Sequence, residues 1–320
     1  MKRLISIAIS LIILAIIYTK IDFPGLIQVF KNCDGWWMAI SLGMVVPLTL
    51  FTAWRLQQLM PTGSQLGLGE ANRLILAASV LNMVLPSKMG DIAKAYFMKQ
   101  RGHLDGTLSL SLVVFEKACD LLSLLLWCVF GLLLYPHKDA LFWAMTVGVV
   151  LGLVTGLFLL SSRKFAHLFF LVVKKFAPKK LHSKLEKLQM SWGEMHEYFW
   201  RDKNQLLKIT GTSIFIWFLH LLQIWFFILA LKAWTPFLAN LALSPLAILA
   251  GLLPLTFAGI GTRDAALIIF YKPYFDAPTA AALGLLCTSR YVLPAIGGLP
   301  FLGQYLATVR DLQQQPRRFR

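Results

Sequence analysis

The sequence predicts an all-α polytopic membrane protein with about six spanning helices and two oppositely oriented re-entrant helical hairpins, arranged as an inverted repeat. Two observations predict this class. The chain has 320 residues, of which 58% are hydrophobic and 14% charged, whereas soluble domains are roughly 45–50% apolar. Its apolar residues also gather in stretches long enough to cross a bilayer, about 20 residues per helix. We therefore expect one integral membrane domain, residues 1–320, without a separate soluble catalytic domain.

Six apolar stretches have the length and composition of spanning helices. They are Leu4–Ile21, Trp36–Ala53, Leu108–Tyr135, Ala140–Leu160, Leu206–Leu231 and Thr279–Ala307. The first stretch follows a basic N-terminus, as in a signal peptide. No small-residue cleavage pattern comes after it, so an uncleaved helix is expected.

Lysine and arginine are concentrated in one loop, which predicts the orientation of the chain. From Ser162 to Lys203 there are ten basic residues, and loops rich in Lys and Arg stay in the cytoplasm. Six spans then place both termini and this loop, about residues 162–205, on the cytoplasmic side of a bacterial-type inner membrane. Apolar clusters in the loop suit an amphipathic helix on the inner leaflet; a solvated basic loop is the alternative. The net charge of +16 indicates contact with anionic lipid rather than with nucleic acid.

Two further apolar segments do not span comfortably. Leu74–Leu85 is short and ends at Pro86, and Leu241–Ile260 is interrupted by Pro245, Gly251, Pro254 and Gly259. Non-helical backbone at membrane depth is tolerated only where protein buries it or where it lines a wet cavity. We therefore expect each segment to form a re-entrant helix–break–helix hairpin.

The two broken segments lie at one spacing within the chain. Pro86 and Pro254 are 168 positions apart, and the same offset carries the starts of spans two and three close to the starts of spans five and six. Span, hairpin and span thus occur twice, in repeat A (about 36–135) and repeat B (about 206–307), facing opposite ways. Inverted repeats of this kind are found in many secondary transporters, whose substrate site lies near the interrupted helices.

Charged residues flank both predicted breaks. Lys88 and Arg263 stand beside helix N-termini, which attract anions, so these two bases predict a site for an anion; purely structural pairing is the alternative. Asp91 and Asp264 fall near helix starts; they cap the helices and pair with Lys88, Lys94 or Arg263, or else they bind a proton or a cation. The structural residues of the hairpins are Pro86, Gly90, Pro254, Gly259 and Gly261.

Ionisable residues also lie within the predicted spans, where they are functional hypotheses by default. Glu116 and Asp120 are four apart in span three and share a helix face, and Arg290 lies in span six. The alternative is an interfacial position for the two acids and a structural pair for Arg290. We include all three among the predicted substrate-binding residues, together with Lys88, Asp91, Lys94, Arg263 and Asp264.

Catalytic and cofactor motifs are not found in the sequence. There is no GxSxG elbow, HExxH pair or P-loop, and the four cysteines have no CxxC spacing. We expect no catalytic residue, no metal and no cofactor. An intramembrane lipid-modifying transferase that works through carboxylates is the alternative.

Three ordered motifs resemble a known family. LPSKMGDIAK, EKACD and LPLTFAGIGTRDAAL are similar to the signature stretches of the lysylphosphatidylglycerol synthase transmembrane-region family, also called the flippase-like domain family. The matching positions are Leu85, Pro86, Gly90, Asp91 and Lys94, then Glu116, Lys117 and Asp120, then Pro254, Gly259, Gly261, Arg263 and Asp264. Asp91 stands where the pattern often has Glu, and Lys88 where Arg is common, which forgoes bidentate phosphate binding.

The resemblance implies a multi-pass inner-membrane protein that moves lipids between leaflets. Bifunctional relatives continue into a soluble domain that aminoacylates phosphatidylglycerol; that activity is not expected of this chain. We predict a flippase for an anionic or phosphate-bearing lipid, or for a lipid-linked precursor. A membrane partner of a lipid synthase or glycosyltransferase that does not itself transport is the remaining alternative.

Overall fold

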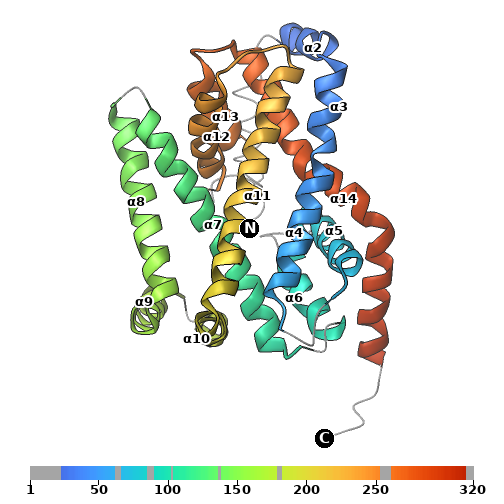
Figure 1. The fold of residues 1–320 in the computed structure, drawn as a ribbon, viewed down its shortest axis with the longest axis vertical. Coiled ribbons are helices and arrows are strands. Elements are labelled where there is room, and N and C mark those ends of the chain that lie inside the picture. Colours follow the sequence, from blue (N-terminus) through green and yellow to red (C-terminus); the bar gives the residue numbers. More distant parts are fainter. Residues whose placement is uncertain are drawn as a thin grey trace, which may run out of the picture. The chain divides into compact units, whose positions relative to one another are not determined.

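The computed structural model describes residues 23–61, 66–84, 90–101, 104–135, 138–178, 182–252 and 261–314. Within these ranges the regular structure is helical (Figure 1). The helices are α2 (Phe23–Lys31), α3 (Gly35–Gly43), α4 (Val45–Leu59), α5 (Leu68–Val84), α6 (Gly90–Arg101), α7 (Gly106–Leu134), α8 (Ala140–Ser161), α9 (Arg163–Phe176), α10 (His182–Arg201), α11 (Lys203–Ala230), α12 (Phe237–Leu252), α13 (Thr262–Tyr271) and α14 (Ala277–Gln314).

Five of the six predicted spans are confirmed as helices long and apolar enough to cross a membrane. They are Gly35–Leu59, formed by α3 and α4 in succession, Gly106–Leu134, Ala140–Ser161, Lys203–Ala230 and Ala277–Gln304. The predicted span Leu4–Ile21 lies outside the described residues. Helices are the form expected of such stretches, because in lipid every backbone polar group must be satisfied within the protein.

Two pairs of short helices occupy the positions of the predicted breaks. Helix α5 packs against α6, and α12 packs against α13 (Figure 1). The segments that join them, residues 85–89 and 253–260, lie outside the described residues, and with them Pro86, Lys88, Pro254 and Gly259. The re-entrant placement of these pairs, and the repeat itself, stay predictions.

Glycines allow helices to approach closely at three points. A Cβ on Gly90 at the start of α6 would overlap the carbonyl oxygen of Ala78 in α5. A Cβ on Gly131 of α7 would overlap the carbonyl of Ala242 in α12, and one on Gly298 of α14 would overlap that of Leu76 in α5. At these positions backbone meets backbone, which only a residue without a side chain permits.

The chain divides into two compact units. One comprises Met1–Leu48, Ala118–Ser161 and Ser213–Arg290, and the other comprises Thr49–Lys117, Ser162–Thr212 and Tyr291–Arg320. Four of the five divisions fall inside helices α4, α7, α11 and α14, and the fifth falls between α8 and α9. Buried residues of α7, α11, α12, α13 and α14, with a few from α2 and α8, form the hydrophobic core of the first unit. In the second unit, α9 packs against α10, and Phe115 of α7 stacks on Phe199 of α10 with ring centroids 3.8 Å apart.

Candidate functional site

Three charged side chains meet in the interior of the second unit. Glu116 of α7, Arg55 of α4 and Lys94 of α6 are only 1%, 1% and 3% exposed. The Arg55 guanidinium donates from Nη2 to Glu116 Oε1 at 3.0 Å, and the Lys94 ammonium donates to Glu116 Oε2. We call these three residues the Glu116 cluster. Each oxygen of one carboxylate therefore has its own base, from a different helix.

Each member of the cluster lies on a helix whose position depends on local packing. Glu116 lies in the first half of the apolar helix α7, next to Phe115, whose stacking on Phe199 fixes this turn. Lys94 lies one turn into α6, and the close approach of Gly90 to Ala78 sets the start of that helix. Helices α6 and α7 follow one another in the chain and α4 lies further away, and the packing of the three helices brings the charges together.

The electrostatic balance of the Glu116 cluster is uneven. It holds two positive charges and one negative charge, and the desolvation of buried ions costs several kcal/mol per ion before pairing. A second pair lies beside it: Lys117 Nζ is 3.5 Å from Asp91 Oδ1, and Asn82 Nδ2 donates to the same oxygen at 3.4 Å. The Lys117 side chain is 45% exposed, so this pair is closer to solvent than the cluster.

A separate ion pair opens helix α13 in the first unit. Arg263 donates to Asp264 Oδ1 from Nη2 at 2.7 Å and from Nε at 3.0 Å. Its Nη2 also donates to the Gly284 carbonyl at 2.8 Å and to Thr288 Oγ1 at 2.9 Å. Asp264 Oδ2 accepts from the backbone N–H of Gly261 at 3.0 Å, where φ is 102°, a conformation that favours glycine. Asp264 thus both caps α13 and pairs with Arg263.

The structure places the other predicted residues as follows. Asp91 pairs with Lys117, whereas Lys94, one of its predicted partners, binds Glu116. Asp120 is partly buried one turn along α7. Arg290 is partly buried in α14, and its Nε has no hydrogen-bond partner among the described residues.

Sequence reasoning missed Arg55. It lies two residues beyond the predicted end of span two at Ala53, and helix α4 continues to Leu59. The signal was present, because an arginine in an apolar stretch is as notable as Glu116. Gly284 was also missed: a Cβ there would lie 2.7 Å from Asp264 Oδ1, so the glycine makes room for that carboxylate.

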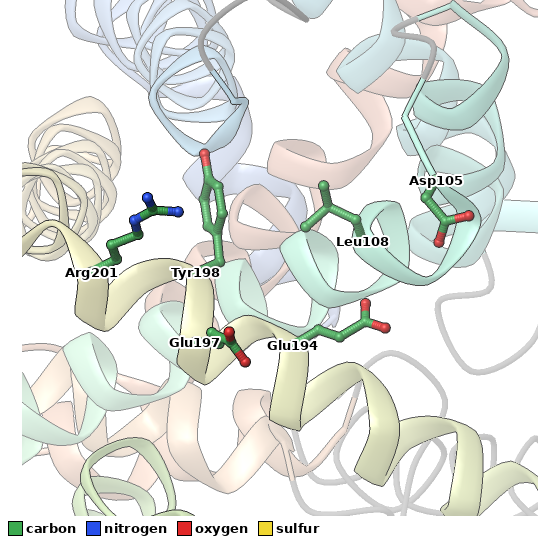
Figure 2. Close-up of a pocket in the computed structure, with 6 residues that line it drawn as sticks. All are labelled: Asp105, Leu108, Glu194, Glu197, Tyr198 and Arg201. Carbon is green, nitrogen blue, oxygen red and sulfur yellow. The ribbon is translucent and has the colours of Figure 1, made fainter.

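A pocket of about 600 Å³ lies where the start of α7 meets α10 (Figure 2). Its lining residues are Asp105, Leu108, Glu194, Glu197, Tyr198 and Arg201. Burial, and then the charge of Asp105, raises the pKa of Glu194. Backbone and side-chain hydrogen bonds from Thr107 lower the pKa of Asp105. Three carboxylates against one guanidinium disfavour an anion, so we place the candidate anion site at the Glu116 cluster instead. No group of three or more His, Cys, Asp or Glu in the described ranges could hold a metal ion.

Comparison with known proteins gives two findings. The family described as "Lysylphosphatidylglycerol synthase TM region" matches residues 3–298. A protein of Methanothermobacter thermautotrophicus, described as "UPF0104 membrane protein", is 23% identical over 291 residues, which cover 83% of this chain and 85% of the relative. The family match covers the two ion-pair regions described above.

Proposed function

The chain belongs to the lysylphosphatidylglycerol synthase transmembrane-region family and is a multi-pass membrane protein, and from this premise we propose that it is a flippase. The substrate we propose is an anionic-headgroup lipid, or a lipid-linked precursor, moved between leaflets of a bacterial-type inner membrane without chemical change. The observation that carries the proposal is the Glu116 cluster. Ionisable residues in membrane helices are costly, and they mark substrate pathways when they face the protein interior.

The geometry of the cluster supports an exchange of partners for Lys94. Arg55 and Lys94 each hold a different oxygen of Glu116. The Lys94 ammonium can therefore leave Glu116 and bind a substrate phosphate while Arg55 continues to neutralise Glu116. No carboxylate is then left buried and unpaired. Lysine suits this role because its ammonium is a point charge on a flexible stem. A charge-assisted contact of this kind contributes about 1.5–3 kcal/mol.

We also propose that α5–α6 and α12–α13 are the re-entrant hairpins of an inverted repeat. The glycine contacts support this. Gly131 of α7 meets Ala242 of α12, and Gly298 of α14 meets Leu76 of α5. Gly131 and Gly298 are 167 positions apart, and Leu76 and Ala242 are 166 apart, close to the offset of 168 between the two prolines. The last span of each repeat thus packs against the first hairpin helix of the other repeat, as a pseudo-two-fold axis requires.

The same offset relates the two ion-pair regions. Lys94 and Arg263 are 169 positions apart, and Glu116 and Gly284 are 168 apart. In repeat A the base binds an acid on a different helix. In repeat B, Gly284 contributes only its backbone carbonyl to Arg263, and the acid that binds Arg263 is its chain neighbour Asp264. We infer that the pair in repeat A can separate during transport, whereas the pair in repeat B, tied into a helix cap, stays closed.

The experiment that tests the function uses purified full-length protein in liposomes that carry a fluorescent phosphatidylglycerol. Accessibility of the label to an impermeant reductant reports its leaflet. Lys94→Gln should slow exchange at least about tenfold at equal reconstitution, from the contact energy above. Arg163→Gln, which removes a base from an exposed pair with Glu197, is the matched control and should exchange at the wild-type rate.

The other outcomes separate the alternatives. Exchange by Lys94→Gln at the wild-type rate would reject the cluster as the site. Mass spectrometry that found the lipid chemically altered would favour a transferase. Wild-type protein that moves none of several anionic lipids would favour a membrane partner of a synthase or glycosyltransferase.

A further inference from the structure

Helix α9 exposes an apolar stripe that no described part of the chain covers. The stripe consists of Leu168, Leu171, Val172 and Phe176, which are 59%, 48%, 48% and 82% exposed. The opposite face carries the buried Ala166 and Phe170, and Phe170 contacts Trp192 of α10 edge to face, with ring centroids 6.2 Å apart. The helix is therefore apolar on two sides, only one of which is used for packing.

The basic residues of α9 fall into two groups. Arg163 and Lys174 are neutralised by α10, through Glu197 at 3.3 Å and Glu186 at 2.6 Å. Lys164 and Lys175 form no ion pair within the described part of the chain. With the spacing 164, 168, 171 and 175, these two lysines share one helix face with the stripe. Helix α9 contains no acidic residue, so the face offers apolar side chains with a lysine near each end.

The short connections between helices α9 and α10 and the neighbouring candidate spans indicate the depth of this face relative to the membrane. Helix α8, a candidate span, ends at Ser161, and α9 begins at Arg163. Helix α10 ends at Arg201, and the candidate span α11 begins at Lys203. One residue at each end leaves no room for a linker, so the helix pair starts and finishes where spans leave the hydrocarbon.

We propose that the α9 stripe binds an anionic lipid surface. The four apolar side chains enter the boundary between headgroups and acyl chains, and Lys164 and Lys175 contact lipid phosphates. In-plane amphipathic helices combine apolar burial with attraction to anionic lipid in this way, and charge complementarity selects lipid over an apolar protein partner. The inference stands independently of the transport activity proposed above.

The test measures depth and lipid preference in the full-length protein. A nitroxide at position 171, in a background with the four cysteines replaced by alanine, should be accessible to oxygen and protected from an aqueous nickel complex. A nitroxide at His167, on the exposed polar edge of α9, should be more accessible to nickel. In membranes of phosphatidylcholine with a minor fraction of phosphatidylglycerol, Lys164→Gln with Lys175→Gln should lower the preference for phosphatidylglycerol by about fivefold per lysine.

The double variant Lys174→Gln with Lys187→Gln removes the same charge from the same helix pair and should change the preference much less. This second measurement needs no cysteine replacement. A label at position 171 that is open to nickel would overturn the proposal in favour of a solvated helix. A label protected from both reagents would overturn it in favour of a protein partner, and equal effects of the two double variants would show that only net charge matters.

Discussion

Replacing Glu116 with glutamine should destabilise the protein far more than replacing Lys94 with methionine. Glu116→Gln removes the carboxylate that both Arg55 and Lys94 bind, and these two bases are buried, at 1% and 3% exposure. Removing one partner of a buried ion pair costs about 3–5 kcal/mol. Lys94→Met leaves Glu116 paired with Arg55 at 3.0 Å, so the variant does not leave the buried carboxylate without a counter-charge, which is the costly outcome.

Thermal unfolding of purified protein in detergent, followed by loss of the folded peak in gel filtration, measures the difference. Glu116→Gln should lower the apparent Tm on the order of 10 °C, and Lys94→Met only slightly, although both should transport poorly. Glu186→Gln, which breaks the exposed pair with Lys174, is the control and should change little. Equal shifts for Glu116→Gln and Lys94→Met, or none for Glu116→Gln, would refute the buried three-residue cluster.

Three further predictions follow from other contacts. Gly131→Val and Gly298→Val should each reduce the yield of folded protein, because the new side chains would overlap the carbonyls of Ala242 and Leu76. Gly303→Val is the control and should not reduce the yield, because a Cβ at Gly303 has nothing within 4 Å. Normal yields of all three variants would contradict the close helix approach. The pKa of Glu194 is raised in the folded protein, so the folded state favours the protonated carboxyl and ionisation opposes folding. The stability contributed by the protonated carboxyl is present at low pH and is lost as the pH rises through the folded pKa. Glu194→Gln should therefore unfold at a slightly higher temperature than the wild type at neutral pH and at the same temperature in acid, and a gain restricted to acid would show that the sign is wrong. Single cysteines at the exposed positions Lys175 and Lys232 should react with an impermeant maleimide from opposite sides of the membrane, because one span, α11, separates them. Labelling of both cysteines from the same side would exclude the predicted topology.

The sequence determined the membrane class and the helices themselves. Five predicted spans and the observed helices agree to within a few residues at most ends, because a run of about 20 apolar residues has only one stable arrangement in lipid. The sequence also located Lys94, Glu116, Arg263 and Asp264, since charges in apolar surroundings are conspicuous without any structure. It further predicted that Asp264 caps a helix and pairs with Arg263, because both bonds are local.

Only the tertiary structure decided which charges meet across helices. Asp91 and Lys94 are three residues apart and were natural partners by spacing, yet Lys94 binds Glu116, 22 residues away, and Asp91 binds Lys117. Arg55 joins the cluster from a third helix, 61 residues from Glu116. Sequence spacing assigns each residue to a face of its own helix, but it does not say which faces pack together. Close backbone contacts such as those of Gly90, Gly131 and Gly298 permit that packing, and the packing brings scattered charges into one buried cluster.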